Sequence, residues 1–303
     1  MSFQHVLVPL DFGTASERAV DLGLAIAAKY QSKVDILHAF YIPPLAYGSG
    51  TMPLSYVPYD DLRRGAQSAL DAAYGKIKER YPSAEALLVD GEPRQRIVET
   101  AAERGVDLIV MGTHGRRGLS HAFWGSVAER IVRTSPVPVL TTGDAEVSGA
   151  FRHVLVATDF GEPAERAIAT GSELATKFDA KLTLVHAYVI PTTTYDERSY
   201  WPAAKIVNEA ETALRRAVEK TKERAPAAES VLVRGDPREG ILAVARERGA
   251  DLIVMGTHGR RGLSRVFLGS IAERVVRTSP IPVLTVGADG KAGDAASPHR
   301  EGR

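Results

Sequence analysis

Cysteine is absent from this sequence of 303 residues, and its absence excludes disulfide bonds, thiolate metal sites and a cysteine nucleophile. Long apolar runs are also absent, since none approaches the roughly 20 residues that a membrane-spanning helix needs. The N-terminus enters a strand pattern at once, without the charged region and cleavage site of a signal peptide. We therefore expect a cytoplasmic protein that has no membrane partner.

A strong net charge is lacking as well. The formal net charge is +1 at pH 7, although 25% of the residues are charged, so no broad basic surface argues for nucleic acid binding. The hydrophobic share of 44% is sufficient for ordinary globular cores. The composition therefore predicts a globular protein that does not bind nucleic acid.

A long segment occurs twice. Residues 107–141 and 251–285 are identical at 29 of 35 positions, and residues 3–13 match residues 151–161. Between these segments the second copy is four residues shorter, in a stretch rich in proline and tyrosine that we interpret as a surface loop. The repeat predicts two copies of one domain, at 1–144 and 151–288, followed by a disordered tail at 289–303.

Each copy alternates strand patterns with helix patterns. In the first copy the predicted strands are 5–10, 33–39, 86–89, 107–111 and 138–142, and the predicted helices are 17–30, 62–80, 93–105 and 126–133. Such alternation implies right-handed crossovers and a parallel sheet with helices on both faces. We therefore predict an α/β fold of two tandem doubly wound domains, with ligands bound beyond the carboxyl ends of the strands.

Glycines with a fixed spacing follow the fourth strand of each copy. In the first copy these are Gly112, Gly115 and Gly125, the last followed by Ser126 at the start of a helix. The second copy has Gly256, Gly259, Gly269 and Ser270. The pattern suits a phosphate cradle of backbone N–H groups. The glycines could instead be turn residues and the serines plain helix N-caps, although a cap and a bound phosphate are compatible.

An aspartate ends the first strand of each copy, at Asp11 and Asp159. It could cap the following helix, or it could hydrogen-bond a ribose hydroxyl or hold a metal carried by phosphates. The matching glycine loop at a second strand end favours these functional roles.

Basic and imidazole side chains accompany these motifs. Arg116 and Arg260, each followed by a second arginine, are either solvated surface residues or charges that complement a polyphosphate. His114 and His258 lack ligand-spaced partners nearby, which favours packing or hydrogen bonding over metal binding. His38 and His186 end the predicted second strands and are expected near a base pocket, where the backbone of Ala39 and Ala187 could contact the base.

Taken together, these motifs resemble the universal stress protein family. The resemblance rests on MGTHGRRGLS followed by Gly-Ser, and on Val-x-x-Asp-Phe at the first strand, in both halves. It implies five-stranded parallel sheets in the order 3-2-1-4-5, in tandem, and an adenine nucleotide in each half: ATP, ADP or AMP, with Mg²⁺ near Asp11 and Asp159. It also implies adenine contacts through the backbone of Ala39 and Ala187.

The resemblance assigns one set of nucleotide-binding positions to each half. In the first half the positions are Pro9, Leu10, Asp11, Ala39, Met111, Gly112, His114, Gly115, Arg116, Gly125, Ser126 and Val127. In the second half they are Ala157, Thr158, Asp159, Ala187, Met255, Gly256, His258, Gly259, Arg260, Gly269, Ser270 and Ile271. Because Leu10 lacks the hydroxyl of Thr158, the two sites need not be equal.

The function expected from these features is that of a stress-response sensor or regulator, acting through nucleotide-dependent conformation or an unidentified protein partner. The alternative is a slow ATPase or a phosphoryl or nucleotidyl transferase on the same fold. No G-x-x-x-x-G-K-[ST] loop or kinase motif set occurs, and we assign no catalytic residue. A scaffold with vestigial sites would predict eroded glycines in one copy, but both copies are intact.

The last strand of each copy predicts how the halves meet. Pro138 and Pro282 cannot donate to a ladder, so these strands belong at a sheet edge. An exposed apolar edge invites pairing. We therefore predict that the two edges pair antiparallel across an internal pseudo-two-fold axis, as an intramolecular pseudo-dimer, and that the whole chain could also form a homodimer.

Overall fold

Ten strands and eight helices make up the described part of the chain. The computed structural model describes residues 2–42, 58–113, 125–142, 151–190, 203–257 and 268–287. The first half contains β1 (His5–Pro9), α1 (Thr14–Tyr30), β2 (Lys33–Phe40), α2 (Tyr59–Arg80), β3 (Ala84–Asp90), α3 (Pro93–Glu103), β4 (Leu108–Gly112), α4 (Ser126–Thr134) and β5 (Val139–Thr142). The second half contains β6 (His153–Ala157), α5 (Glu162–Phe178), β7 (Lys181–Tyr188), α6 (Ala203–Lys222), β8 (Glu229–Arg234), α7 (Pro237–Arg248), β9 (Leu252–Gly256), α8 (Ser270–Thr278) and β10 (Val283–Val286).

All ten strands belong to one sheet, in the order β3-β2-β1-β4-β5-β10-β9-β6-β7-β8. Within each half the order is 3-2-1-4-5 and the pairing is parallel. The fold class expected from the repeat is therefore confirmed. The predicted tail and most of the proline- and tyrosine-rich loop lie outside the described residues.

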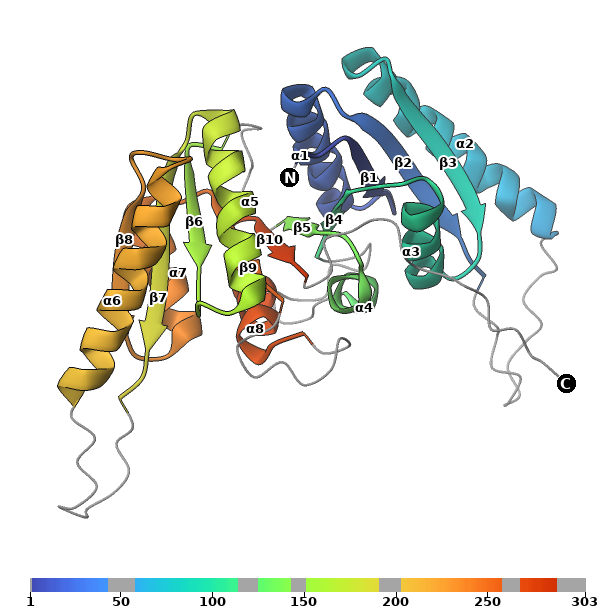
Figure 1. Ribbon diagram of the computed structural model, residues 1–303. Coiled ribbons are helices and arrows are strands. Elements are labelled where there is room, and N and C mark those ends of the chain that lie inside the picture. The colour runs from blue at the N-terminus through green and yellow to red at the C-terminus, as the bar shows by residue number, and fades with distance from the viewer. Residues whose placement is uncertain are drawn as a thin grey trace, which may run out of the picture.

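Helices cover both faces of the sheet (Figure 1). One cluster of buried side chains packs α1, α2, α5 and α6 against one face, and a second cluster packs α3, α4, α7 and α8 against the other. Strands buried on both faces explain the continuous apolar runs of the sequence. In β1, for example, Val6, Leu7 and Val8 are completely buried.

Two helices begin earlier than the sequence pattern predicts, and β3 extends beyond the predicted 86–89 at both ends. Helix α1 begins at Thr14 and α2 at Tyr59, each three residues before the predicted start. The first turn of α2 is exposed at Tyr59, Asp60 and Asp61, so it carries none of the apolar periodicity from which its start was predicted. In α1 the small residues Ala15 and Ser16 are buried, and the sequence pattern missed them.

The two halves meet where β5 and β10 pair antiparallel, as predicted. Leu140 lies opposite Leu284, and Val139 lies opposite Thr285. Since position 140 corresponds to position 284 in the repeat, this pair lies on the pseudo-two-fold axis. Both prolines stand just before the paired residues, where a missing N–H costs no ladder bond.

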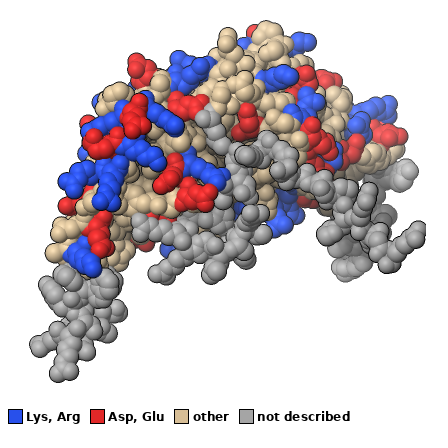
Figure 2. Space-filling view, in the orientation of Figure 1, with Lys and Arg blue, Asp and Glu red and all other residues tan. Residues whose placement is uncertain are grey.

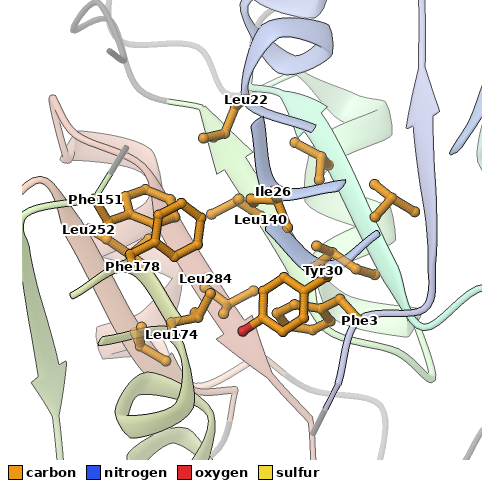
Figure 3. Close-up of a cluster of buried hydrophobic side chains, with 14 of the residues drawn as sticks. Phe3, Leu22, Ile26, Tyr30, Leu140, Phe151, Leu174, Phe178, Leu252 and Leu284 are labelled. Carbon is orange, nitrogen blue, oxygen red and sulfur yellow. The ribbon is translucent and has the colours of Figure 1, made fainter. Parts of the chain in front are cut away.

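Side chains from both halves share one core beside this axis (Figure 3). The Lys29 ammonium lies 5.7 Å from the ring centroid of Phe178, and that of Lys177 lies 5.3 Å from the ring centroid of Tyr30. These reciprocal cation–π contacts join the carboxyl-terminal ends of α1 and α5. The interface is therefore a continuation of the domain cores rather than a surface contact.

We predict that the isolated first half, residues 1–144, forms a dimer. Removal of β10 exposes the edge of β5. In a dimer, Leu140 of one half-chain can then take the place of Leu284 and pair with Leu140 of the other half-chain. Light scattering should give about twice the mass of the half-chain. A Leu140→Asp half-chain should be monomeric, and a monomeric wild-type half-chain at micromolar concentration would contradict the pairing.

A buried ionic network lies in the first half, where β1 and β2 begin, and the second half lacks its aspartate. Asp35, 1% exposed, accepts hydrogen bonds from Arg104, and His5 Nε2 lies 2.8 Å from its carboxylate. Burial raises the pKa of Asp35, but the bonds from His5 and Arg104 outweigh it and hold the pKa below its usual 3.8. In the second half Thr183 occupies this position and contacts His153 at 2.8 Å.

Replacing Asp35 by threonine, as in the second half, should lower the free energy of unfolding at pH 7 by about 1–3 kcal/mol, because Arg104 and His5 lose their acceptor. Since the folded-state pKa is depressed, the contribution of Asp35 is complete above the unfolded-state pKa and is lost as pH falls through the folded one. Urea denaturation should therefore show the difference in free energy of unfolding between wild type and Asp35→Thr narrowing as the pH falls below about 4.

The control for this prediction is Asp21→Asn. Asp21 pairs with Arg80 at the surface, where both side chains are more than half exposed, so its loss should cost less than about 1 kcal/mol at any pH. A gap between wild type and Asp35→Thr that does not change with pH would show that Asp35 does not contribute as a carboxylate.

Candidate functional site

Each first strand ends in a turn that contains a residue of positive φ. Phe12 has φ 64° and its ring lies 4.6 Å from that of His38; Phe160 has φ 62° and lies 4.4 Å from the ring of His186. A bulky residue with positive φ is energetically unfavourable. Its presence in both halves marks these turns as positions where local strain is maintained by the surrounding structure.

Two histidines, each two residues before the end of β2 or β7, hold these turns in place. His38 Nδ1 donates to the Leu10 carbonyl oxygen, and His186 Nδ1 donates to that of Thr158, each at 2.7 Å. The Leu10 N–H in turn donates to the Leu37 carbonyl oxygen at 2.8 Å. The neighbouring strand therefore fixes the path of the chain directly before each aspartate.

The aspartates close local turns and also line a cavity. Asp11 Oδ1 accepts from the Gly13 N–H at 2.9 Å, and Asp159 Oδ1 accepts from the Gly161 N–H at 3.0 Å. These glycines, rather than the aspartates, are the N-cap residues of α1 and α5. The capping interpretation is therefore replaced by an Asx-type turn, which leaves the carboxylate beside the cavity.

The second element of the site is the start of α4. The helix begins at Ser126, as predicted, and its N-cap is Gly125, so the alternative interpretation of Ser126 as the N-cap does not hold; in α8 Gly269 is the N-cap. The Gly125 N–H donates to the Thr113 carbonyl oxygen at 2.8 Å, which fixes the glycine before the helix. No side chain caps either helix start within the described residues.

A cavity of about 340 Å³ lies among these elements in the first half, and an equivalent one of about 210 Å³ lies in the second. The predicted positions that line the first cavity are Pro9, Leu10, Asp11, Ala39, Met111, Gly112, Gly125, Ser126 and Val127. Those that line the second are Ala157, Thr158, Asp159, Ala187, Met255, Gly256, Gly269, Ser270 and Ile271. The fold thus brings together residues up to 119 positions apart in the sequence, Pro9 and Ala128.

Some predicted residues cannot be placed, and some lining residues were not predicted. His114, Gly115, Arg116, His258, Gly259 and Arg260 lie outside the described residues. The first cavity is also lined by Ser16, Pro93, Ile97 and Thr113. Pro93 recurs as Pro237, a repeat that could have indicated the cavity, but a proline at a helix start has a sufficient structural explanation.

The first glycine of each motif is explained by packing. A Cβ at Gly112 would lie 2.7 Å from the carbonyl carbon of Ala15, and one at Gly256 would lie 2.9 Å from that of Pro163. These glycines therefore let α1 and α5 begin against the ends of β4 and β9. They are strand residues, so the turn interpretation was wrong for them.

Among the described residues that line the cavities, few carry charged or metal-binding side chains. The described residues contain no group of three His, Asp or Glu side chains that could hold a metal ion by themselves. On the face shown in Figure 2, acidic and basic side chains are interspersed. No described helix has both the length and the apolar character needed to cross a membrane.

We predict that Gly112→Ala destabilises the protein by about 1–3 kcal/mol, as expected for overpacking against a backbone that cannot move away. The matched control is Gly65→Ala, in the exposed part of α2, where a Cβ meets nothing within 4 Å; it should stabilise by about 0.5–1 kcal/mol. Urea denaturation measures both changes. Equal behaviour of the two variants would disprove the packing explanation.

Comparison with known proteins gives consistent matches over both halves. The sequence matches the Universal stress protein family over residues 2–142 and again over residues 150–287. A universal stress protein of Mycobacterium tuberculosis is 28% identical over 294 residues, covering 93% of this chain and 96% of that protein. Universal stress protein YxiE of Bacillus subtilis is 32% identical over 145 residues, covering 46% of this chain and 97% of that protein.

The fold also has a solved counterpart. The crystal structure of a universal stress protein from Archaeoglobus fulgidus aligns with 95% of this chain and 100% of its own, with a TM-score of 0.73 at 22% sequence identity. At this identity the likeness shows that the two chains share a fold, and it extends over both halves.

Proposed function

This chain belongs to the Universal stress protein family, and on that basis we propose that each half binds one adenine nucleotide in the cavity at the carboxyl ends of its strands. The observation that carries the proposal is the start of α4 and α8. In both, the first helical residues line the cavity and no side chain caps the helix within the described residues.

An uncapped helix start is a site for phosphate. The first N–H groups of a helix have no partner within the helix, and the helix dipole favours negative charge there. In the first half Ser126, Val127 and Ala128 supply these groups to the cavity. Phosphates placed here would receive hydrogen bonds from the backbone, so the site needs no lysine or arginine among its described residues.

The remaining walls suit a nucleoside. Leu37, Ile97 and Met111 form an apolar surface against which a base can pack, beside the backbone of Ala39. The Asp11 carboxylate can accept from a ribose hydroxyl. A Mg²⁺ ion carried by the phosphates needs one or two protein carboxylates, and Asp11 or Asp159 would fit as a single ligand.

We infer that the output is regulatory. The titratable side chains among the described residues of the first cavity are Asp11 and His38, and His38 already donates to the Leu10 carbonyl oxygen. That set favours a nucleotide-responsive regulator, acting through conformation or a protein partner, over a dedicated ATPase or transferase. We place this regulator in the cytoplasm on the sequence expectation alone.

Calorimetry with ATP and Mg²⁺ tests the proposal through Ser126→Glu. A glutamate at the first helical position favours the helix, but its charge repels phosphate at the same place. We expect two bound nucleotides in the wild type, one in Ser126→Glu or Ser270→Glu, and none in the double variant. For each occupied site, ATP at about 100 times its dissociation constant should raise the free energy of unfolding of the protein by about 2.7 kcal/mol.

The matched control is Ser126→Gln, which has the same size but no charge and should retain both sites. The absence of any ATP, ADP or AMP binding to the wild-type protein would disprove the proposed function. Two sites that persist in the double glutamate variant would show that phosphate binds elsewhere.

A further inference from the structure

A further cavity, which we call the α5–α6 groove, lies between helices α5 and α6 of the second half. Both helices cover the same face of the sheet (Figure 1), and the cavity between them measures about 600 Å³. That volume lies within the roughly 300–1,000 Å³ typical of small-molecule sites. None of its lining residues lines the cavity beside Asp159. The α5–α6 groove is therefore separate from the proposed nucleotide site.

The groove is lined by smaller side chains than those at the corresponding positions of the first half. Ser172 stands in α5 where α1 has Leu24, and Thr221 stands in α6 where α2 has Ile77. The hydroxyls of Ser172 and Thr221 donate to carbonyl oxygens of their own helices, at 2.6 and 2.7 Å. These hydroxyls are therefore already satisfied, and the replacements enlarge the groove without making its walls strongly polar.

Basic side chains predominate along the α6 side of the groove. Arg216, Lys220 and Arg224 line it and are exposed, and none of them has an acidic partner among the described residues. Three glutamates also line the groove, namely Glu162, Glu165 and Glu223. Glu162 already pairs with Arg166 at 2.6 Å, which leaves three basic side chains against two carboxylates. The charge balance therefore favours an anion.

The first half shows how a carboxylate is held between the corresponding helices. Asp21 of α1 forms an ion pair with Arg80 of α2 at 2.6 Å. In the second half Ala169 stands at the position of Asp21, whereas Arg224 retains the arginine. The second half therefore keeps the cation of this pair, while α5 no longer supplies the carboxylate.

We propose that the α5–α6 groove binds a small amphipathic carboxylate. Its carboxylate group takes the place of the aspartate that α5 lacks, beside Arg224, and its apolar body packs on Ile168, Ala213 and Ala217. An ion pair at such an exposed position contributes little by itself, so the ligand must also bury apolar surface, at about a fourfold gain in affinity for each buried methylene. This inference does not depend on the proposed nucleotide binding.

A ligand-observed NMR titration of the full-length chain with octanoate tests the proposal. Affinity should increase from acetate to hexanoate to octanoate, because the longer chains bury more methylenes. Octanol and octylammonium have the same apolar body without the negative charge, and each should bind at least about threefold more weakly than octanoate. Tighter binding of octylammonium than of octanoate would overturn the proposal, because the glutamates would then determine the charge of the ligand.

Three substitutions locate the bound octanoate. Ala169→Asp restores the first-half residue, which can pair with Arg224 and repels a carboxylate, so octanoate affinity should fall at least about tenfold; the size-matched Ala169→Asn should retain most of it. Arg224→Gln should weaken octanoate binding about threefold to tenfold. The control is Lys222→Gln, which removes a cation of the same helix that does not line the groove and pairs with Glu219; it should leave octanoate affinity unchanged.

The outcomes distinguish this site from general attraction and from the nucleotide site. Urea denaturation verifies that each variant is folded. No octanoate binding to the wild-type chain, or equal octanoate affinity in wild type, Ala169→Asp and Arg224→Gln, would overturn the proposal. An equal loss in Lys222→Gln and Arg224→Gln would also overturn it, since non-specific attraction would then explain the binding. ATP binding, measured separately, is unaffected by any of these results because the two sites share no lining residue.

Discussion

The antiparallel pairing of β5 and β10 is the interaction on which the rest of the molecule depends. Without it, each half would end in an exposed apolar strand. With it, two five-stranded sheets become one sheet of ten strands, and the two helix layers continue from one half into the other. The carboxyl-terminal ends of α1 and α5 meet on one face as a result (Figure 1).

Proline restricts this pairing to one place. Pro138 and Pro282 cannot donate to a ladder, so the paired residues follow them and the contact is short, from Val139 to Thr141 on one side. Two threonine side chains add hydrogen bonds within this short ladder. Thr141 donates to the Val283 carbonyl oxygen and Thr285 donates to that of Val139, each at 3.1 Å. A short, symmetric ladder with reciprocal side-chain bonds specifies one register.

The same architecture accounts for the position of the cavities. Parallel strands place their carboxyl ends at one edge of the sheet, so the turn after β1 and the start of α4 lie close together although they are far apart in the sequence. Gly112 allows α1 to begin directly against β4. The cavity is therefore a consequence of close helix–strand packing on one side and, on the other, of a helix start that no side chain among the described residues caps.

The sequence by itself determined the repeat, the alternation of strands and helices, and the edge position of the proline-bearing strands. These follow from periodicity and local stereochemistry, which each residue carries with it. The grouping of Asp11 with Gly125 and Ser126 was expected from the family resemblance, which implies the strand order. Only the tertiary structure decided why Gly112 must be glycine and that Ser16 contacts Asp11. Both depend on which atoms approach one another after packing. The spacing of apolar residues does not reveal that a small polar residue such as Ser16 is buried.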